Sequence, residues 1–282
     1  MNQGKWVDQI AQLQLPDGSW GYFHSLSRPT KAQPMTTEQA LRRLLALGLS
    51  RDDELIMRTI HYMKAVLARR IAPPDSREKV LNWDFFEQMM MAAWIKSFDP
   101  DDEQAAEIAC FWAEIICAAF ADGKLNHAVY EAEYRRRIPK LHGGERLIGI
   151  PQYYMVMLLK GMLDAKTESA FVAHIVNHPS GIYYVYDECI AKVPETFCSL
   201  QASRYLSALE CLSGYRCAPE NLRFATDWVL SQKSGDGWDL GPLAKDGIYF
   251  PISDSWRKPE NRIDDCTRRV CRIIARLDVC AP

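Results

Sequence analysis

Apolar residues recur every three or four positions along most of the chain, whereas strict alternation of apolar and polar residues is rare. A spacing of three and four places apolar side chains on one face of an α-helix, so the pattern predicts an all-α fold. Strand-like alternation is confined to two short segments, 182–186 and 248–252. The helices predicted from this periodicity span residues 3–14, 36–48, 52–69, 84–97, 101–120, 126–138, 151–163, 167–177, 199–213, 219–232 and 264–277.

The predicted helices are of two kinds that alternate along the chain. Segments 89–94 and 153–159 are apolar nearly all round, so they must be covered by protein on every side. Segments 52–69 and 219–232 carry charges on one face, which is typical of helices that border solvent. One helix of each kind, joined by a short turn, makes a hairpin, and we expect five or six hairpins.

A similar turn follows several of the predicted outer helices. Its fullest copies are 16–21, with the sequence Pro-Asp-Gly-Ser-Trp-Gly, and 235–238, with Gly-Asp-Gly-Trp. Weaker copies at 74–76, 122–124 and 180–184 give one turn every 47–58 residues, and a repeat of this length indicates an array of similar units. Glycine allows the positive φ that ends a helix, and the tryptophan ring can cover the helix end.

The two fullest copies of the turn stand at opposite ends of the chain, which favours an arrangement with the first and last hairpins side by side. We therefore expect a single domain over residues 1–282 with the architecture of an α/α toroid (barrel). Its inner helices would surround a central cavity. An open helical array is the alternative.

The turn at 14–21 resembles the repeat of squalene and other triterpene cyclases in its pattern Gln-x-x-Asp-Gly-Ser-Trp-Gly, and the turn at 232–238 matches less completely. The same inner and outer helical hairpins form the β subunits of protein prenyltransferases. The resemblance implies an α/α toroid whose aromatic cavity binds an isoprenoid, in a prenyltransferase-like or terpenoid cyclase-like protein of unassigned reaction, although one fold can host unrelated chemistry. The matching residues are Gln14, Asp17, Gly18, Ser19, Trp20, Gly21, Gln232, Asp236, Gly237 and Trp238.

Composition narrows the class of protein and its partners. Of 282 residues 48% are hydrophobic, and 34 basic against 36 acidic residues give a net charge of −2. No basic run suggests a nucleic-acid partner, and no apolar stretch approaches the length of a membrane span. The nine cysteines are an odd number without close pairs, which favours reduced thiols and a cytoplasmic location. We expect a small hydrophobic ligand, an isoprenoid, whereas the sequence does not indicate whether a partner subunit is needed.

Triterpene cyclases protonate their substrate with an Asp-x-Asp-Asp motif, and residues 99–102 match it with the order Asp-Pro-Asp-Asp. The middle acid of such a motif has to stay protonated, which requires burial and acidic neighbours. Here the acids occupy the same turn between helices as Ser-Arg-Asp-Asp at 50–53. We therefore interpret Asp99 as a helix N-cap, with Pro100 in the first helical position.

Protein prenyltransferases hold zinc with an Asp-x-Cys pair and a later His, so zinc is the cofactor that the resemblance implies. Asp264 and Cys266 resemble the first two ligands, but no His follows them, and a distant residue such as His24 would have to complete the set. The favoured interpretation is a capping Asp264 and a core Cys266 at a helix start. His174 and His178, four positions apart, are interpreted as a solvated helix end.

Candidate site residues lie at the starts of the inner helices and in the aromatic loop at 247–257. A polar group on a buried helix is costly unless it is paired or faces a wet cavity, and aromatic faces suit a carbocation or an isoprenoid chain. The candidate catalytic acids are Asp84, Asp254 and Asp265. The candidate ligand-binding residues are Trp20, Tyr22, His24, Gln88, Tyr184, Gln201, Arg204, Tyr249, Trp256 and Arg257.

Two other functions fit the same residues. A carbohydrate-active α/α toroid would use the paired carboxylates of Asp84 and Asp254 across an aromatic cleft. A non-catalytic scaffold would have its cavity packed shut by the side chains of the inner helices.

Overall fold

A computed structural model describes residues 3–235, 237–245, 251–253 and 255–278. All the regular secondary structure in this part of the chain is helical, which confirms the prediction of an all-α protein. None of the helices within the same residues has both the length and the apolar character needed to cross a bilayer. The helices are α1 (Gln3–Ala11), α2 (Thr37–Ala46), α3 (Glu54–Leu67), α4 (Trp83–Phe98), α5 (Glu103–Ala119), α6 (His127–Arg137), α7 (Tyr153–Leu158), α8 (Ala165–Asn177), α9 (Leu200–Leu212), α10 (Ala218–Asn221), α11 (Arg223–Ser231) and α12 (Pro259–Asp278).

Every predicted helix corresponds to an observed one, and the differences lie at the ends. The segment 219–232 is divided into α10 and α11, and α12 begins at Pro259, earlier than predicted, because proline fits the first turn of a helix. The segment 182–186 makes an isolated bridge between Ile182 and Tyr186 and no strand. The second strand-like segment, 248–252, lies mostly outside the described residues.

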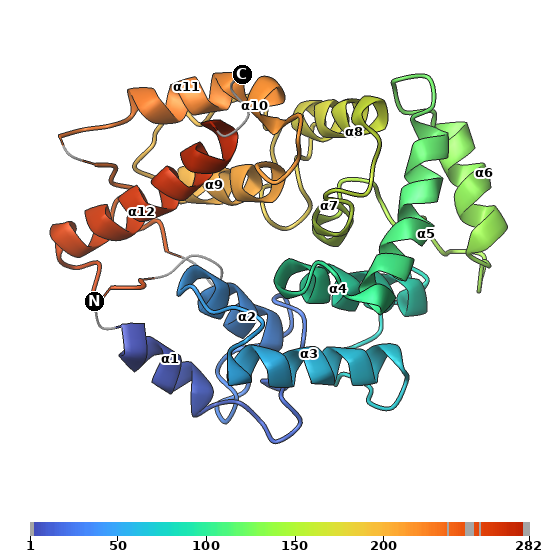
Figure 1. Cartoon of the computed structure of the whole chain (residues 1–282), viewed down its shortest axis with the longest axis horizontal. Helices are drawn as coiled ribbons and strands as arrows, with labels where there is room; N and C mark the ends of the chain where they lie inside the picture. Colours follow the sequence, from blue (N-terminus) through green and yellow to red (C-terminus); the bar gives the residue numbers. More distant parts are fainter. Residues whose placement is uncertain (1–2, 236, 246–250, 254, 279–282) are drawn as a thin grey trace.

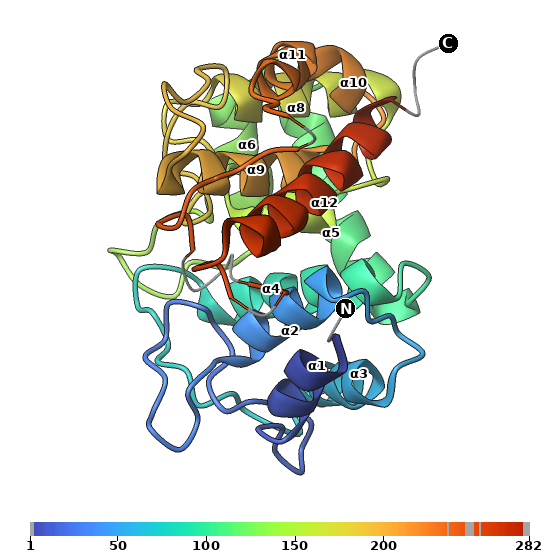
Figure 2. The ribbon, with the colours of Figure 1, turned by 90° about the vertical axis from the view of Figure 1, so that its left-hand side faces the viewer.

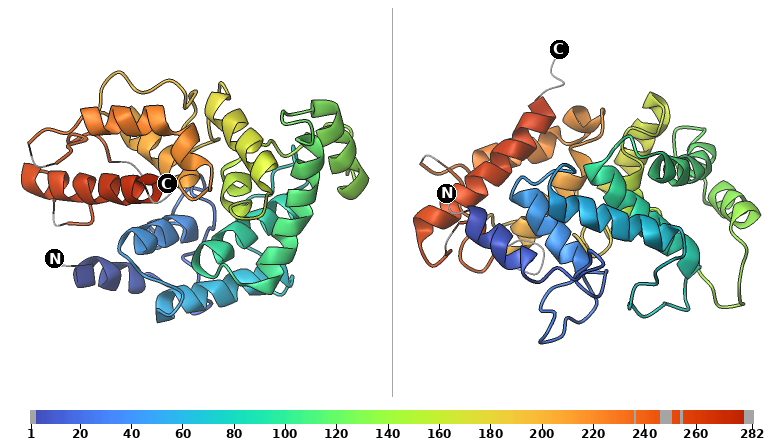
Figure 3. Two further views of the ribbon diagram at one scale, coloured as in Figure 1. Left: turned by 45° about the horizontal axis from the view of Figure 1, so that its top comes forward. Right: turned by 60° about the horizontal axis from the view of Figure 1, so that its bottom comes forward.

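The helices form an inner and an outer group. All six residues of α7 are buried, and α4 and α9 bury most of theirs. In Figure 1 the helices α2, α4, α7, α9 and α12 lie between α1 and α3 on one side and α8, α10 and α11 on the other, with α6 beyond α5 at one end. Figure 3 shows this arrangement from two further directions. A single hydrophobic cluster with members from Ile10 to Leu277 joins the two groups.

Segments from the two ends of the chain touch each other. The indole Nε1 of Trp6 in α1 donates a hydrogen bond to the carbonyl oxygen of Ser253 at 3.0 Å. The guanidinium of Arg272 in α12 donates to the carbonyl oxygen of Ala46, the last residue of α2, at 3.3 Å. Figure 2 shows α12 running past α2 in front of the viewer. The C-terminal helix α12 therefore touches the end of α2.

The tryptophans of the two fullest turns occupy equivalent places. The indole Nε1 of Trp20 donates to the carbonyl oxygen of Ile10 in α1 at 2.8 Å, and that of Trp238 donates to Val229 in α11 at 2.7 Å. Both rings are almost completely buried. Each ring therefore covers the end of the preceding helix, as the turn sequence predicts.

The same tryptophans also hold the inner helix that follows each turn. The backbone N–H of Trp20 donates to Thr37 Oγ1 in α2 at 2.9 Å, and that of Trp238 donates to Thr267 Oγ1 in α12 at 3.1 Å. The two turns thus share two hydrogen bonds of the same kind, although they are about two hundred residues apart. This equivalence is the structural evidence for a repeated unit.

The first turn requires glycine at one position. Gly18 has a φ of +91°, and a Cβ atom there would lie 2.4 Å from the carbonyl oxygen of Arg58 in α3. The carbonyl oxygen of Gly18 accepts a hydrogen bond from Thr59 Oγ1 at 2.9 Å. The turn therefore packs directly on the backbone of α3, and only a residue without a side chain fits.

The acidic segment 99–102 is a helix cap, although the capping residue differs from the predicted one. Asp102 is the N-cap of α5, accepts a backbone hydrogen bond from the first turn and pairs with Lys64. Asp99 instead accepts a hydrogen bond from Arg51 at 2.7 Å. The prediction of Asp99 as N-cap with Pro100 at the first helical position is therefore wrong, because the helix begins three residues later than that assignment requires.

We predict that Trp20→Phe and Trp238→Phe each lower the free energy of unfolding by about 1–2 kcal/mol, because each leaves a helix-end carbonyl without its indole donor. Urea denaturation followed by circular dichroism measures the change. Trp228→Phe is the matched control, since its indole nitrogen makes no hydrogen bond to the described residues. Equal losses for all three variants would mean that the indole hydrogen bonds do not matter.

Candidate functional site

A buried carboxylate at the start of α2 forms the centre of the candidate site. Thr36 caps this helix by accepting from the backbone N–H of Gln39 at 3.3 Å, and the Gln39 side chain accepts from the N–H of Thr36 at 3.1 Å. This capping box places Glu38 in the first turn, where the helix dipole favours a negative charge. The side chain of Glu38 is completely buried.

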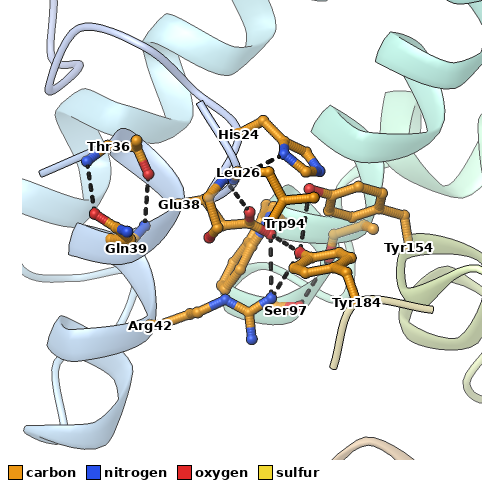
Figure 4. A network of polar contacts seen from close by, with 12 residues as sticks. His24, Leu26, Thr36, Glu38, Gln39, Arg42, Trp94, Ser97, Tyr154 and Tyr184 are labelled. Carbon is orange, nitrogen blue, oxygen red and sulfur yellow. Dashed lines mark hydrogen bonds and ion pairs between the residues drawn. The ribbon is translucent and has the colours of Figure 1, made fainter. Parts of the chain in front are cut away.

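Both oxygens of the Glu38 carboxylate accept hydrogen bonds (Figure 4). Its Oε1 accepts from the hydroxyl of Tyr184 at 2.6 Å, from the indole of Trp94 at 3.1 Å and from Arg42 Nη2 at 3.2 Å. Its Oε2 accepts from the backbone N–H of Ser25 at 2.8 Å. The donors come from α2, α4 and two separate loops, so the carboxylate joins four segments of the chain.

Glu38 is ionised at neutral pH in spite of its burial. Burial by itself raises the pKa of a carboxyl group, but the adjacent Arg42 guanidinium and the hydrogen bonds to the carboxylate outweigh it. Together they lower the pKa of Glu38 to about 2. The group is therefore a fixed negative charge and an acceptor, and it does not supply a proton.

The guanidinium of Arg42 lies among aromatic rings. Its central carbon is 4.3 Å from the ring centroid of Tyr153, 5.5 Å from that of Trp94 and 5.6 Å from that of Tyr184. The faces of these rings attract a cation, most strongly where water is excluded. The Arg42 side chain is only 10% exposed, so the rings and Glu38 together compensate for the loss of water around it.

Part of the Arg42 guanidinium has no hydrogen-bond acceptor within the described residues. Nη2 donates to Glu38 and to the hydroxyl of Tyr184, the latter at 2.8 Å. The Nε atom is buried without a partner there, and Nη1 donates to none of these residues either. Figure 4 shows a terminal nitrogen of Arg42 pointing away from Glu38 and Tyr184. A buried donor without an acceptor is costly, so an anionic or carbonyl oxygen placed beside the guanidinium would be favoured.

Tyr184 reaches the site through an unusual backbone conformation. Its φ is +57°, in the left-handed region that residues with a Cβ atom seldom adopt, at a cost of about 1–2 kcal/mol. The backbone N–H of Tyr184 donates to Asp187 Oδ1 at 3.0 Å, which helps to hold the turn. Strain of this kind persists where the surrounding contacts determine the conformation, which is common at functional sites.

A second buried carboxylate positions the loop that carries His24. Asp75 accepts hydrogen bonds from the backbone N–H groups of Phe23 at 2.6 Å and of His24 at 2.9 Å, and from Ser27 Oγ at 2.6 Å. The imidazole of His24 then lies 5.2 Å from the ring of Tyr184, measured between centroids. The turn at 74–76, predicted as a weak copy of the repeat, thus contributes a residue that organises the site.

The sequence predicted two members of this cluster, Tyr184 and His24, and missed the rest. Glu38 and Arg42 stand four positions apart, which is the spacing of a helical ion pair, and Glu38 lies between the two residues of the capping box, Thr36 and Gln39. These signals could have identified the pair. Nothing in the local sequence distinguishes Trp94 and Tyr153 from core residues, because their role depends on contacts between helices.

Asp265, a predicted catalytic acid, fastens a loop to α12. Its Oδ2 accepts from the backbone N–H groups of Ile252 and Ser253 at 3.0 and 3.1 Å, from Ser253 Oγ at 2.8 Å and from the indole of Trp256 at 2.7 Å. Asp265 and Trp256 are both buried. The structure thus brings these two predicted site residues together, as acceptor and donor of one hydrogen bond. Asp254 lies outside the described residues.

Asp84 and Gln88 lie away from Glu38, beside a hollow of about 360 Å³ between the end of α3 and the start of α4. The carboxylate of Asp84 pairs with Arg77 and, at 3.6 Å, with Arg69. Its side chain is 38% exposed, so it belongs to the surface of the protein.

The other predicted ligand-binding residues occupy separate places. Trp20 is a core residue of the first turn, and Tyr22 next to it is partly exposed. Gln201 in α9 donates to Glu188 at 2.7 Å. Arg204 and Arg257 are exposed, and Tyr249 lies outside the described residues.

The two candidate zinc ligands have different surroundings. Asp264 pairs with Arg268 at 3.0 Å, whereas Cys266 is completely buried, and burial raises the pKa of its thiol to about 12. The prediction of a core Cys266 is confirmed. The prediction of Asp264 as an N-cap is wrong, because α12 already begins at Pro259 and Asp264 lies inside it. The described residues contain no group of three or more His, Cys, Asp or Glu side chains placed to hold a metal ion.

His174 and His178 lie at the end of α8, with ring centroids 5.5 Å apart. His174 is partly buried against Phe120, and this burial lowers the pKa of His174 to about 4. The prediction of a solvated helix end is therefore wrong for His174.

Comparison of the chain with models of protein families, with curated proteins and with solved structures finds no match. The assignment of a function therefore depends on the geometry described above.

The stability of the protein should depend on the ionisation of Glu38. Its pKa is about 2 in the folded protein and near the ordinary value of 4.5 when unfolded, so the stabilisation is complete above pH 4.5 and is lost as the pH falls toward 2. The expected contribution at pH 7 is about 3 kcal/mol. Glu38→Gln should lower the free energy of unfolding at pH 7 by a comparable amount, because Arg42 is left as an uncompensated buried charge.

Urea denaturation at several pH values between 7 and 3 tests this prediction. The wild type should lose more stability over this range than Glu38→Gln, whereas the control Glu131→Gln, at an exposed position of α6, should follow the wild type. Identical pH profiles for the wild type and Glu38→Gln would contradict the assigned role of the carboxylate.

Proposed function

We propose that the chain is an α/α toroid of five to six hairpins that binds an isoprenoid among its inner helices, as a prenyltransferase-like or terpenoid cyclase-like protein. The observation that carries the proposal is the set of aromatic rings around the Arg42 guanidinium. Rings that stabilise one cation suit an isoprenoid, whose reactions pass through carbocations and whose chain is apolar.

The toroidal part of the proposal is supported by the contacts between the two ends of the chain. The hydrogen bond from Arg272 to Ala46 joins the last inner helix to the first, and the bond from Trp6 to Ser253 joins α1 to the loop before α12. The equivalent turns at Trp20 and Trp238 support a series of similar hairpins.

The ligand in this proposal has an anionic head and an apolar chain. The Nη1 atom of Arg42, which donates to none of the described residues, would bind an oxygen of a diphosphate or a carboxylate. The rings of Tyr153, Tyr154 and Tyr184, which contact one another at centroid distances of 5.3–6.1 Å, would lie along the chain. Glu38 would hold Arg42 and Tyr184 in place for this binding.

The proton donor of a cyclase-like reaction is not Glu38, because that carboxyl is ionised. Asp84 lies in ion pairs and Asp265 accepts four hydrogen bonds, so the surroundings of both favour the role of acceptor. Asp254 is the remaining sequence-based candidate for the acid.

A second candidate is a non-catalytic isoprenoid carrier or scaffold. Two observations favour it. The Arg42 guanidinium already lies against the ring of Tyr153, and both oxygens of Glu38 already accept hydrogen bonds from the protein. The carbohydrate-active alternative has less support, because Asp84 is held by surface arginines away from the aromatic cluster.

Native mass spectrometry of the purified protein with farnesyl diphosphate, geranylgeranyl diphosphate and squalene, with and without zinc, tests the proposal. We expect a one-to-one complex with at least one isoprenoid diphosphate. Arg42→Gln should weaken this complex about tenfold or more, since a charge-assisted contact to the head group is lost.

Two controls make the result interpretable. Arg223→Gln changes an exposed arginine of α11 and should bind as the wild type does. Tyr184→Phe keeps the ring and removes the hydroxyl that donates to Glu38, so it should lower the stability but retain binding if the ring faces carry the apolar chain. The absence of a complex with all three compounds would exclude the proposal, and turnover of a bound isoprenoid would separate an enzyme from a carrier.

A further inference from the structure

The hollow between α3 and α4 has the features of a binding site for a small molecule. Its volume of about 360 Å³ is in the usual range for small-ligand pockets. Apolar side chains from the end of α3 and the turn after it, Val66, Leu67 and Ile71, line one part, and arginine, carboxyl and amide groups line the rest. Six of the ten lining residues are polar or charged, so the hollow sets a short apolar wall beside a mainly charged side.

The charges around the hollow are only partly matched. Three arginines, Arg69, Arg70 and Arg77, face two carboxyl groups, those of Asp84 and Glu87. Asp84 pairs with both Arg69 and Arg77. No hydrogen bond or ion pair to the described residues involves the Arg70 guanidinium, and the hollow carries one positive charge in excess.

Three polar groups, two that line the hollow and one near it, have unused hydrogen-bonding capacity. The amide of Gln88, four residues after Asp84 on α4, makes no hydrogen bond to the described residues. Glu87 accepts from the indole of Trp83 at 3.2 Å through one oxygen, and burial raises the pKa of Glu87. The hydroxyl of Tyr62, one turn before Val66 on α3, is buried without a partner among the described residues and is close enough to Glu87 to be affected by its charge.

The backbone at this place is strained. Arg69 has a φ of +56° at the end of α3, where glycine is usual, and the following N–H, that of Arg70, donates to the carbonyl oxygen of Ala65 at 2.9 Å. An arginine in the left-handed region costs about 1–2 kcal/mol. This conformation turns the chain so that two successive arginines border the hollow.

We propose that this hollow binds a small organic anion, a carboxylate or a phosphate monoester with an apolar body. The Arg70 guanidinium and the Gln88 amide bind the anionic oxygens, since guanidinium groups bind carboxylate and phosphate in the same forked geometry. The apolar body lies against Val66, Leu67 and Ile71. The hollow shares no lining residue with the Glu38 cluster, and this proposal does not depend on the isoprenoid proposal.

Isothermal titration calorimetry of the full chain with four probes tests the proposal. The probes are phenyl phosphate, benzoate, inorganic phosphate and benzyl alcohol. We expect saturable one-to-one binding of phenyl phosphate or benzoate with a dissociation constant below about 10 mM, and binding at least about tenfold weaker for inorganic phosphate and benzyl alcohol. Whichever of phenyl phosphate and benzoate binds more tightly identifies the preferred anionic group, phosphate or carboxylate.

Variants connect the binding to the hollow. Arg70→Gln should weaken the preferred probe about tenfold, and it should fold normally because the side chain is exposed. Gln88→Leu should weaken it less, through the loss of one neutral hydrogen bond. Arg223→Gln, on the distant helix α11, is the matched control and should bind like the wild type.

Three results would overturn the proposal. The first is no saturable binding of phenyl phosphate or benzoate at about 10 mM. The second is that a control probe binds as tightly as phenyl phosphate or benzoate. Equal binding of inorganic phosphate would show that the apolar wall is not used, and equal binding of benzyl alcohol would show that the charge is not used. The third is unchanged binding by Arg70→Gln. None of these results bears on Arg42, so failure here and failure of the isoprenoid proposal are distinguishable.

Discussion

The burial of one negative charge, on Glu38, determines the arrangement at the centre of the protein. An ionised carboxylate without water is stable only if opposite charge and hydrogen-bond donors surround it. Glu38 obtains these from Arg42 one turn later, Trp94 in α4, Tyr184 in a distant loop and the backbone of Ser25. Each donor fixes the segment that carries it, so the charge requires α2, α4 and both loops to meet. The rings around Arg42 follow from the same constraint, because the guanidinium that neutralises Glu38 has itself to be stabilised away from water.

Buried carboxylates perform the same task elsewhere in the chain. Asp75 holds the loop of His24 through two backbone N–H groups, and Asp265 holds the loop before α12. Glu168 in α8 accepts from the backbone of Cys217 at 3.1 Å and from Arg216 at 3.3 Å, which fastens the turn before α10. Long connections between short helices bury little apolar surface of their own, so hydrogen bonds to a carboxylate are an effective way of holding them. An acidic residue in this chain is therefore weak evidence of a catalytic role until the hydrogen bonds that its carboxylate oxygens accept have been identified.

The sequence predicted the helices and the repeated turn well, because both are local. Periodicity over ten residues is enough to identify α2 or α3, and glycine with tryptophan is enough to identify the turn that Trp20 completes. The site was predicted poorly, because its contacts are not local. Glu38 is separated from Trp94 by 56 positions and from Tyr184 by 146. The aromatic pattern of 183–186 identified one member of the site, Tyr184. The N-caps predicted for α5 and α12, Asp99 and Asp264, were each wrong by a few positions, because competing polar residues near a helix end differ little in free energy.

The ionised state of Glu38 limits the chemistry that the centre of the protein can perform. A carboxylate with a pKa of about 2 cannot protonate an alkene, so a cyclisation started by protonation needs an acid from another part of the chain. In the isoprenoid-binding function proposed above, the Arg42 guanidinium would bind an anionic head and the neighbouring rings would contact an apolar chain. Within the proposed isoprenoid function, transfer of a prenyl group from a diphosphate needs no acid to protonate an alkene, unlike a cyclisation started by protonation. For that proposed function, the unused Nη1 of Arg42 beside the tyrosine rings would favour a diphosphate-bearing isoprenoid over a neutral hydrocarbon.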